Sequence, residues 1–224
     1  MATANEKLAN SLSALKNLQD GGRRVFQSAE LSRVHREQLK QAGFVHEIIR
    51  GWLMSGSPDT REGDSTLWYA SFWEFSARYA ASRFGQDWHL SPEQSLLLHA
   101  QNTAIPTRVV VYSHNGTGNP ANLPFQTSLY DLKTSAMPPA TDLTTIHDLR
   151  VYTTAAALVK LQESFFQRFP IEAQVALSAI GDSSALLAPL LEGGHPYIAG
   201  RLAGALRRVG RTAIADDLVV GMKA

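Results

Sequence analysis

The spacing of apolar residues near the start of the chain predicts a first helix over residues 5–18. Four leucines recur there at steps of four, three and three, which places their side chains along one helical face. They are Leu8, Leu12, Leu15 and Leu18. The pair Gly21-Gly22 then predicts the end of the helix.

A second helix is predicted from about Arg33 to Ala42, after the short apolar strand Val25-Phe26 and the candidate N-cap Ser28. Helical periodicity gives this segment two different faces. The inward face carries Leu31, His35, Leu39 and Ala42, and the opposite face carries Arg33, Arg36, Glu37 and Lys40. Gly43 ends the helix.

Two apolar runs, 44–49 and 52–54, predict a β-hairpin whose tip is Arg50-Gly51, because glycine permits the positive φ that tight turns require. The order of helix, strand, helix and hairpin is typical of a winged helix-turn-helix over residues 1–55. In that fold the second helix, at 32–42, enters the major groove, and the hairpin at 44–54 forms the wing.

Double-stranded DNA is therefore one predicted partner of this segment. Residues 22–54 hold six Lys/Arg and three Asp/Glu, a net charge of +3, although the whole chain has only +1. The candidate DNA-contacting residues are Arg23, Arg24, Ser32, Arg33, Arg36, Glu37, Lys40 and Arg50. The alternative is a protein-docking module whose basic residues are merely solvated, because a fold does not fix a function.

The remainder of the chain predicts an α+β region followed by helices, so the fold class is α+β. A linker rich in Ser, Gly, Pro and Asp at 55–66 separates the first domain from an α+β domain at 64–152 and a helical region at 153–224. Aromatic residues at helical spacing after the linker suit a packed core better than a base-stacking platform. They are Trp68, Phe72, Phe75 and Tyr79.

Strands are predicted at 108–112, 125–132 and 146–152, with a loop at 134–144. Beyond Thr153, glycine and proline divide the chain into a helical array. The predicted helices are 155–169, 171–180, 183–191, 197–209 and 213–222. Over residues 194–224 there are five Lys/Arg and two Asp/Glu, which suits a second DNA contact and ordinary solvated helix faces equally well.

Residues that would carry catalysis or hold a cofactor are scarce. With no cysteine, the chain has no disulfides, thiol nucleophiles or thiolate metal sites. The seven histidines show no metal-binding spacing, and Gly-x-Ser-x-Gly is absent. We therefore expect no catalytic site, metal or cofactor. Without a signal peptide or an apolar run of about 18 residues, we expect a cytoplasmic protein that does not enter membranes.

The run GGRRVFQSAELSRVHREQLKQAGFVHEIIRGWLM resembles the N-terminal winged helix of AbiEi-type antitoxins, which repress transcription in bacterial type IV toxin–antitoxin systems. The runs LPFQTSLYDL, IHDLRVYTTAAALVKL and AGRLAGALRRVGRTAIADDLVVGMKA resemble the region that precedes the catalytic domain in a group of bacterial Fic-family proteins. The resemblance implies a repressor of its own operator, with a toxin or a Fic-domain protein as a further partner.

Fic enzymes transfer AMP with a motif of the form H-x-F-x-[DE]-G-N-G-R. The nearest approach to it here runs from His195 to Arg201 and lacks the acidic residue, the asparagine and the second glycine. Without them neither the metal ligand nor the phosphate-binding turn forms, so we interpret the chain as non-catalytic and His195 as a loop or cap residue. Whether the gene continues into a catalytic Fic domain is open, as are the operator sequence and the oligomeric state.

Overall fold

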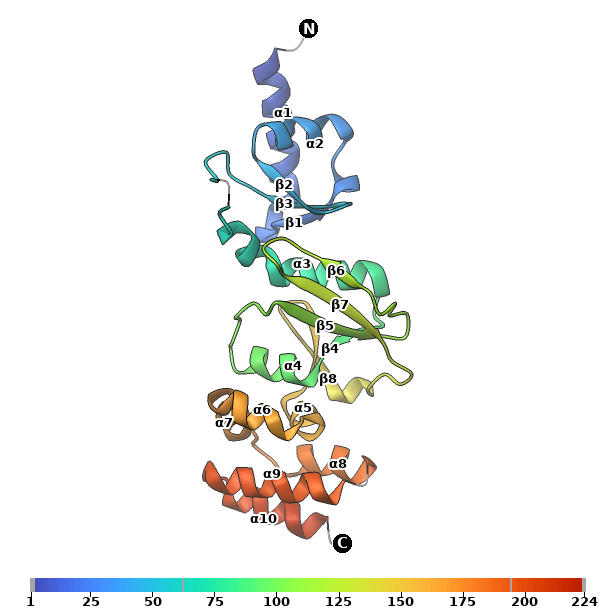
Figure 1. Ribbon diagram of the computed structural model, residues 1–224, viewed down its shortest axis with the longest axis vertical. Helices are drawn as coiled ribbons and strands as arrows, with labels where there is room; N and C mark the ends of the chain where they lie inside the picture. Colours follow the sequence, from blue (N-terminus) through green and yellow to red (C-terminus); the bar gives the residue numbers. More distant parts are fainter. Residues whose placement is uncertain (1–2, 62, 194, 223–224) are drawn as a thin grey trace. The chain divides into compact units, whose positions relative to one another are not determined.

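The computed structural model describes residues 3–61, 63–193 and 195–222, which form a mixed α+β fold (Figure 1). The chain divides into two compact units. The first comprises Met1–Arg83, Ile105–Arg108 and Pro120–Leu129; the second comprises Phe84–Ala104, Val109–Asn119 and Tyr130–Ala224. The predicted three-domain division, with boundaries at 55, 64 and 152–153, stays a prediction.

The first unit begins with helix α1 (Ala4–Leu18), as the leucine spacing predicts. Thr3 caps it, because the Glu6 amide donates to the Thr3 hydroxyl and the Thr3 amide donates to the Glu6 carboxylate. The 3-10 helix η1 (Asp20–Gly22) then leads into strand β1 (Val25–Gln27).

A second 3-10 helix, η2 (Ser28–Glu30), precedes helix α2 (Arg33–Gln41). The prediction that Ser28 caps a helix is wrong, because Ser32 is the N-cap of α2 and its hydroxyl accepts from the His35 amide at 3.2 Å. Leu31 causes the difference, since it is extended and only 4% exposed, so the chain turns it into the core before the helix begins.

Strands β2 (Val45–Ile49) and β3 (Trp52–Ser55) confirm the predicted hairpin, and Gly51 at its tip has φ 89°. With β1 they form an antiparallel sheet of order β1-β3-β2. This sheet, α1 and α2 enclose one apolar cluster. Its buried members are Leu15, Phe26, Leu31, Leu39, Val45 and Leu53.

Helix α3 (Thr66–Phe84) belongs to the same unit and carries the predicted aromatic stripe. Trp68, Phe72 and Phe75 are fully buried, which confirms that they are core residues. Phe75 meets Trp52 of β3 edge to face, with 5.7 Å between ring centroids, so α3 packs directly on the hairpin.

Strand β4 (His89–Leu90) and helix α4 (Pro92–His99) follow α3 along the chain. A four-stranded sheet has the order β4-β5-β7-β6, with β5 (Arg108–Ser113), β6 (Pro120–Asn122) and β7 (Ser128–Lys133). The predicted strand 125–132 begins too early, because Phe125 and Gln126 have positive φ and form a turn.

The single strand predicted at 146–152 is instead a hairpin that follows the 3-10 helix η3 (Ala140–Asp142). Its strands are β8 (Leu143–Ile146) and β9 (Leu149–Tyr152). The turn residues His147 and Asp148 have φ values of 49° and 62° without being glycine, so the sequence gives little sign of this turn.

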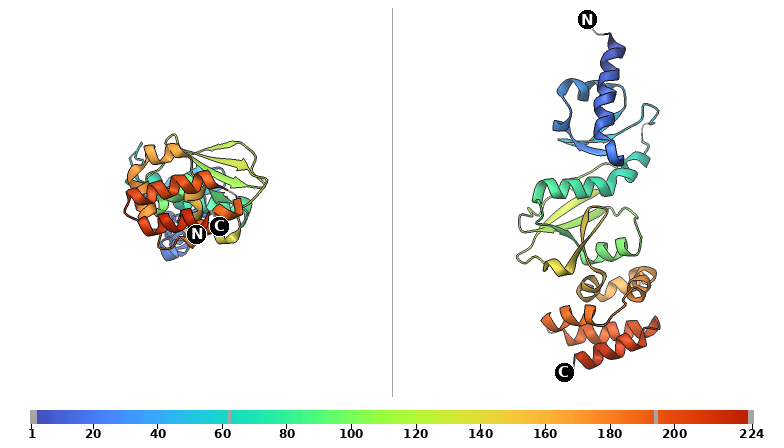
Figure 2. Two further views of the ribbon diagram at one scale, coloured as in Figure 1. Left: turned by 90° about the horizontal axis from the view of Figure 1, so that it is seen from below. Right: turned by 180° about the vertical axis from the view of Figure 1, so that it is seen from behind.

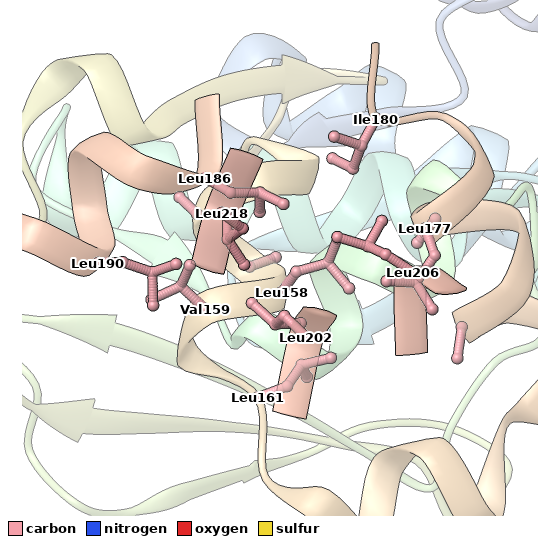
Figure 3. Packing of buried hydrophobic residues seen from close by; sticks show 14 of the residues in the cluster. Leu158, Val159, Leu161, Leu177, Ile180, Leu186, Leu190, Leu202, Leu206 and Leu218 are labelled. Carbon is pink, nitrogen blue, oxygen red and sulfur yellow. The ribbon is translucent and has the colours of Figure 1, made fainter. Parts of the chain in front are cut away.

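The chain then forms the helices α5 (Thr154–Lys160), α6 (Glu163–Arg168), α7 (Pro170–Ser178), α8 (Ser184–Gly193), α9 (Pro196–Arg208) and α10 (Thr212–Gly221). Helices α9 and α10 lie side by side (Figures 1 and 2). The array closes over buried leucines contributed by five of its helices, including Leu158, Leu186 and Leu202 (Figure 3).

One predicted helix, 155–169, is wrong because the chain breaks it between α5 and α6. Leu161 is extended there, with φ −72° and ψ 146°, and its freed carbonyl oxygen accepts from Arg201 Nη2 at 2.7 Å. Neither glycine nor proline marks the break. The tertiary contact therefore decides it rather than local propensity.

Candidate nucleic-acid interface

Helix α2 exposes the N-terminal part of the face that the sequence predicts to be polar. Arg33 has the most exposed of its charged side chains, at 83%, and its Nε donates to Glu37 Oε1 at 2.9 Å. This bond lowers the pKa of the Glu37 carboxyl and raises that of the Arg33 guanidinium. An ion pair this exposed stabilises the fold little, so either side chain is able to leave it for a ligand.

The opposite face of α2 holds the helix in place. Leu39 is fully buried, and His35 Nδ1 lies 2.8 Å from the hydroxyl of Ser11, a buried residue of α1. The same hydroxyl donates to Gln38 Oε1 at 2.6 Å. The prediction that His35 lies on the inward face of the helix is confirmed, and this polar contact fixes how α2 lies against α1.

Arg36 is half-buried and contributes to the structure. Its Nη1 donates to the Ser28 carbonyl oxygen at 2.9 Å, while the Ser28 amide donates to the Gly51 carbonyl oxygen at 2.8 Å. Ser28 thus connects α2 to the tip of the hairpin. The hydrogen bond from Arg36 is the one that ties it to α2.

The three carboxylates of residues 22–54 are all paired. Besides Glu37 with Arg33, Glu30 meets Arg23 at 2.5 Å, and Glu47 of β2 meets Lys40 of α2. Arg23 also donates to the Val25 carbonyl oxygen. The net +3 of this segment therefore resides on Arg24, Arg36 and Arg50.

Arg24 and Arg50 differ in how they are held. The backbone amide of Arg24 donates to the Glu74 carboxylate at 3.1 Å, and its exposed guanidinium lies 3.4 Å from the Ala70 carbonyl oxygen. Arg50 is exposed at the hairpin tip, and its side chain makes no hydrogen bond or ion pair with any residue that the structure describes. An anion that bound Arg50 would therefore break no hydrogen bond or ion pair of this side chain with the described residues.

Val34, in the first turn of α2, was missed by the sequence analysis. Its side chain is 61% exposed, between Arg33 and the inward-facing His35. A methyl-bearing side chain at the start of a helix suits contact with the methyl group of thymine in the major groove. The helical phase of the segment was the available signal, because it places position 34 outside the inward face.

Most of the arginines in the basic C-terminal region form hydrogen bonds or ion pairs with other residues of the chain. Arg207 pairs with Asp216 at 2.6 Å, Arg211 donates to the Ser178 carbonyl oxygen, and Arg201 binds Leu161 as described above. These bonds weaken the case for a second DNA contact. His195 is the N-cap residue of α9, as predicted, and residues 196–201 lie in that helix.

The described residues give few signs of other chemistry. No group of three or more possible metal ligands gathers within residues 3–61, 63–193 and 195–222. No helix in the same part of the chain has the length and apolar character needed to cross a membrane.

The sequence matches no protein-family model and no curated protein. Its structure is similar to the crystal structure of the RV2827C protein from Mycobacterium tuberculosis, with a TM-score of 0.55. The likeness covers 95% of this chain and 81% of that chain at 14% sequence identity. At such low identity it shows a shared fold and nothing about activity.

Proposed function

We propose that residues 3–55 are a winged helix-turn-helix and that the protein binds double-stranded DNA through α2 and the β2–β3 hairpin. The observation that carries the proposal is an exposed α2 N-terminus beside a hairpin whose tip bears Arg50, which is exposed and has no partner among the described residues. The bonds through Ser28 connect the two elements. In this fold the second helix reads base edges and the wing binds phosphates or the minor groove.

We assign the residues of this surface three roles: base contact, phosphate contact and structural support. Arg33 has the flexible cationic group suited to a guanine edge, and Val34 has the methyl groups suited to thymine. Arg50 and Arg24 supply sequence-independent attraction to phosphate. Arg36, Lys40 and Arg23 support this surface from within, because each is held by a partner in the fold.

The resemblance to AbiEi-type antitoxins supports a narrower version of the proposal. In it the protein represses an operator near its own gene, and a toxin or a Fic-domain protein is its second partner. The approach to the Fic motif lies in α9 and lacks the residues that hold metal and phosphate, so we propose no AMP transfer by this chain.

The second candidate is a protein-docking module, which the exposed apolar side chain of Val34 favours. In this case the module regulates a Fic-type enzyme without catalysing a reaction. Salt separates the candidates, because phosphate binding weakens steeply with ionic strength and apolar docking responds little.

The test is a fluorescence-anisotropy titration of the full chain with the duplex upstream of its gene and with a scrambled duplex, each at low and physiological salt. We expect tighter binding to the upstream duplex and a marked loss with salt. Arg33→Ala should lower the affinity for the preferred duplex by about 5- to 150-fold if the arginine reads a base. Equal affinity for both duplexes, or no binding at low salt, would favour the docking module.

A further inference from the structure

A cavity of about 490 Å³ lies in the second unit, between α4, the strands β5 and β9, and the end of α5. Its walls include His89, Ser91, Glu93, Tyr112, Tyr152 and Lys160. The volume falls in the range of small-molecule sites. No part of the proposed DNA-binding surface contributes to it.

Two deeply buried side chains in this cavity have polar atoms without partners. His89 is 3% exposed; its Nδ1 donates to the Leu90 carbonyl oxygen at 2.8 Å, which leaves Nε2 as a free acceptor in the neutral ring. Tyr152 is 6% exposed, and its hydroxyl has no hydrogen-bond partner in the described part of the chain. Neither atom is sealed from solvent, so both are open to a ligand or water in the cavity.

Aromatic packing holds these groups in place. The His89 and Tyr112 rings are stacked, with centroids 5.4 Å apart and planes 12° apart, and Tyr152 meets His89 edge to face. Burial raises the pKa of the Tyr152 hydroxyl to about 12, so it remains a hydrogen-bond donor at neutral pH. The site therefore offers a fixed acceptor and a fixed donor.

Of the two charged residues in the cavity wall, Lys160 and Glu93, only Glu93 is paired within the described part of the chain. Lys160, at the end of α5, lies over the Tyr152 ring with Nζ 5.7 Å from its centroid, and no ion pair of Lys160 occurs among the described residues. The carboxylate of Glu93 is already paired with Arg168 at 3.1 Å. Lys160 thus leaves one cation at the cavity wall, over the ring of Tyr152, without an ion pair among the described residues.

We propose that this cavity binds a small organic anion that carries a carboxylate or phosphate group together with a hydroxyl or N–H donor. The oxyanion would meet Lys160 and the Tyr152 hydroxyl, since both favour negative charge. The donor would meet His89 Nε2, which has only a lone pair to offer. The proposal concerns the second unit alone and holds whether or not the first unit binds DNA.

Isothermal titration calorimetry of the full chain with two sets of probes tests the site. The two sets show whether the site binds a phosphate or a carboxylate. Nucleoside 5′-monophosphates represent phosphates, with the neutral nucleosides as controls. Aromatic hydroxy acids such as 4-hydroxybenzoate represent carboxylates, with 4-methoxybenzoate as the control that lacks the donor. We expect saturable binding below about 1 mM in at least one set, and at least about tenfold weaker binding of its control.

Variants then locate the binding. Lys160→Gln removes the cation from an exposed helix end, and Tyr152→Phe removes only the hydroxyl. Each substitution should lower the affinity for the anion by about tenfold or more. Lys16→Gln, in the first unit, removes the same charge and should change nothing. Circular dichroism checks that the variants fold. No saturable binding of either set up to about 10 mM, or equal binding by wild type and Lys160→Gln, would overturn the proposal.

Discussion

Arg50→Gln tests the electrostatic part of the DNA-binding proposal with the least damage to the fold. The three carboxylates of residues 22–54 are paired, so Arg24, Arg36 and Arg50 carry the net +3. Arg36 is tied to Ser28, whereas Arg50 is exposed at a turn and has no partner among the described residues. Its removal should therefore leave the free energy of unfolding unchanged.

The size of the effect follows from counterion release. Two phosphate contacts, by Arg24 and Arg50, give a plot of log affinity against log salt a slope of about −1.8, and one contact gives about −0.9. Between about 50 and 200 mM salt, the wild type should therefore lose about 12-fold in affinity and Arg50→Gln only about 3.5-fold. The variant should bind more weakly at low salt and approach the wild type as salt increases.

Anisotropy titrations at four or more salt concentrations measure both slopes. The matched control is Lys133→Gln, which removes one exposed positive charge from the end of β7 in the sheet. This control should keep the wild-type slope, because Lys133 lies outside the proposed interface. The same slope for Arg50→Gln and wild type would show that the hairpin tip does not touch phosphate.

Three further predictions concern the fold that supports these sites. Arg36→Ala should cost about 1–3 kcal/mol of unfolding free energy, measured in urea, because it removes a charge-assisted bond to Ser28; a neutral result would exclude this role. Leu39→Ala should cost about 2–5 kcal/mol, with the exposed Val34→Ala as a near-neutral control; equal costs would contradict the orientation of α2. Burial lowers the pKa of the His89 imidazole, so the folded state resists protonation and stability should fall as the pH drops below about 6.5. The melting temperature of His89→Gln should fall less than that of wild type over this range, and parallel curves would refute the assignment.

The elements that the sequence predicts well are those with strong local signals. Leucine spacing located α1, and the glycine at position 51 located the turn between β2 and β3. Turns made by non-glycine residues, such as Phe125-Gln126 and His147-Asp148, were missed because side-chain chemistry there only weakly favours positive φ. The break after Lys160 depends on Arg201, which is distant in sequence.

In the candidate interface too, the sequence predicts what local spacing determines and misses what tertiary contacts determine. Helical phase correctly separated the buried Leu39 from the exposed Arg33. It did not reveal that Arg36 binds Ser28 or that Lys40 binds Glu47, because those contacts form only when α2 folds against the hairpin and η2. The cavity beside His89 has no sequence signal at all, since residues from 89 to 160 meet there only in the folded chain.

The most direct measurement of the central claim is an amide NMR titration of the full chain with the duplex upstream of its gene. The DNA-binding account predicts that shifts concentrate at the N-cap Ser32, at residues 33–37 of α2 and at the hairpin tip, 50–51. A scrambled duplex should produce smaller shifts there. Shifts confined to other parts of the chain, or none at saturating duplex, would contradict it.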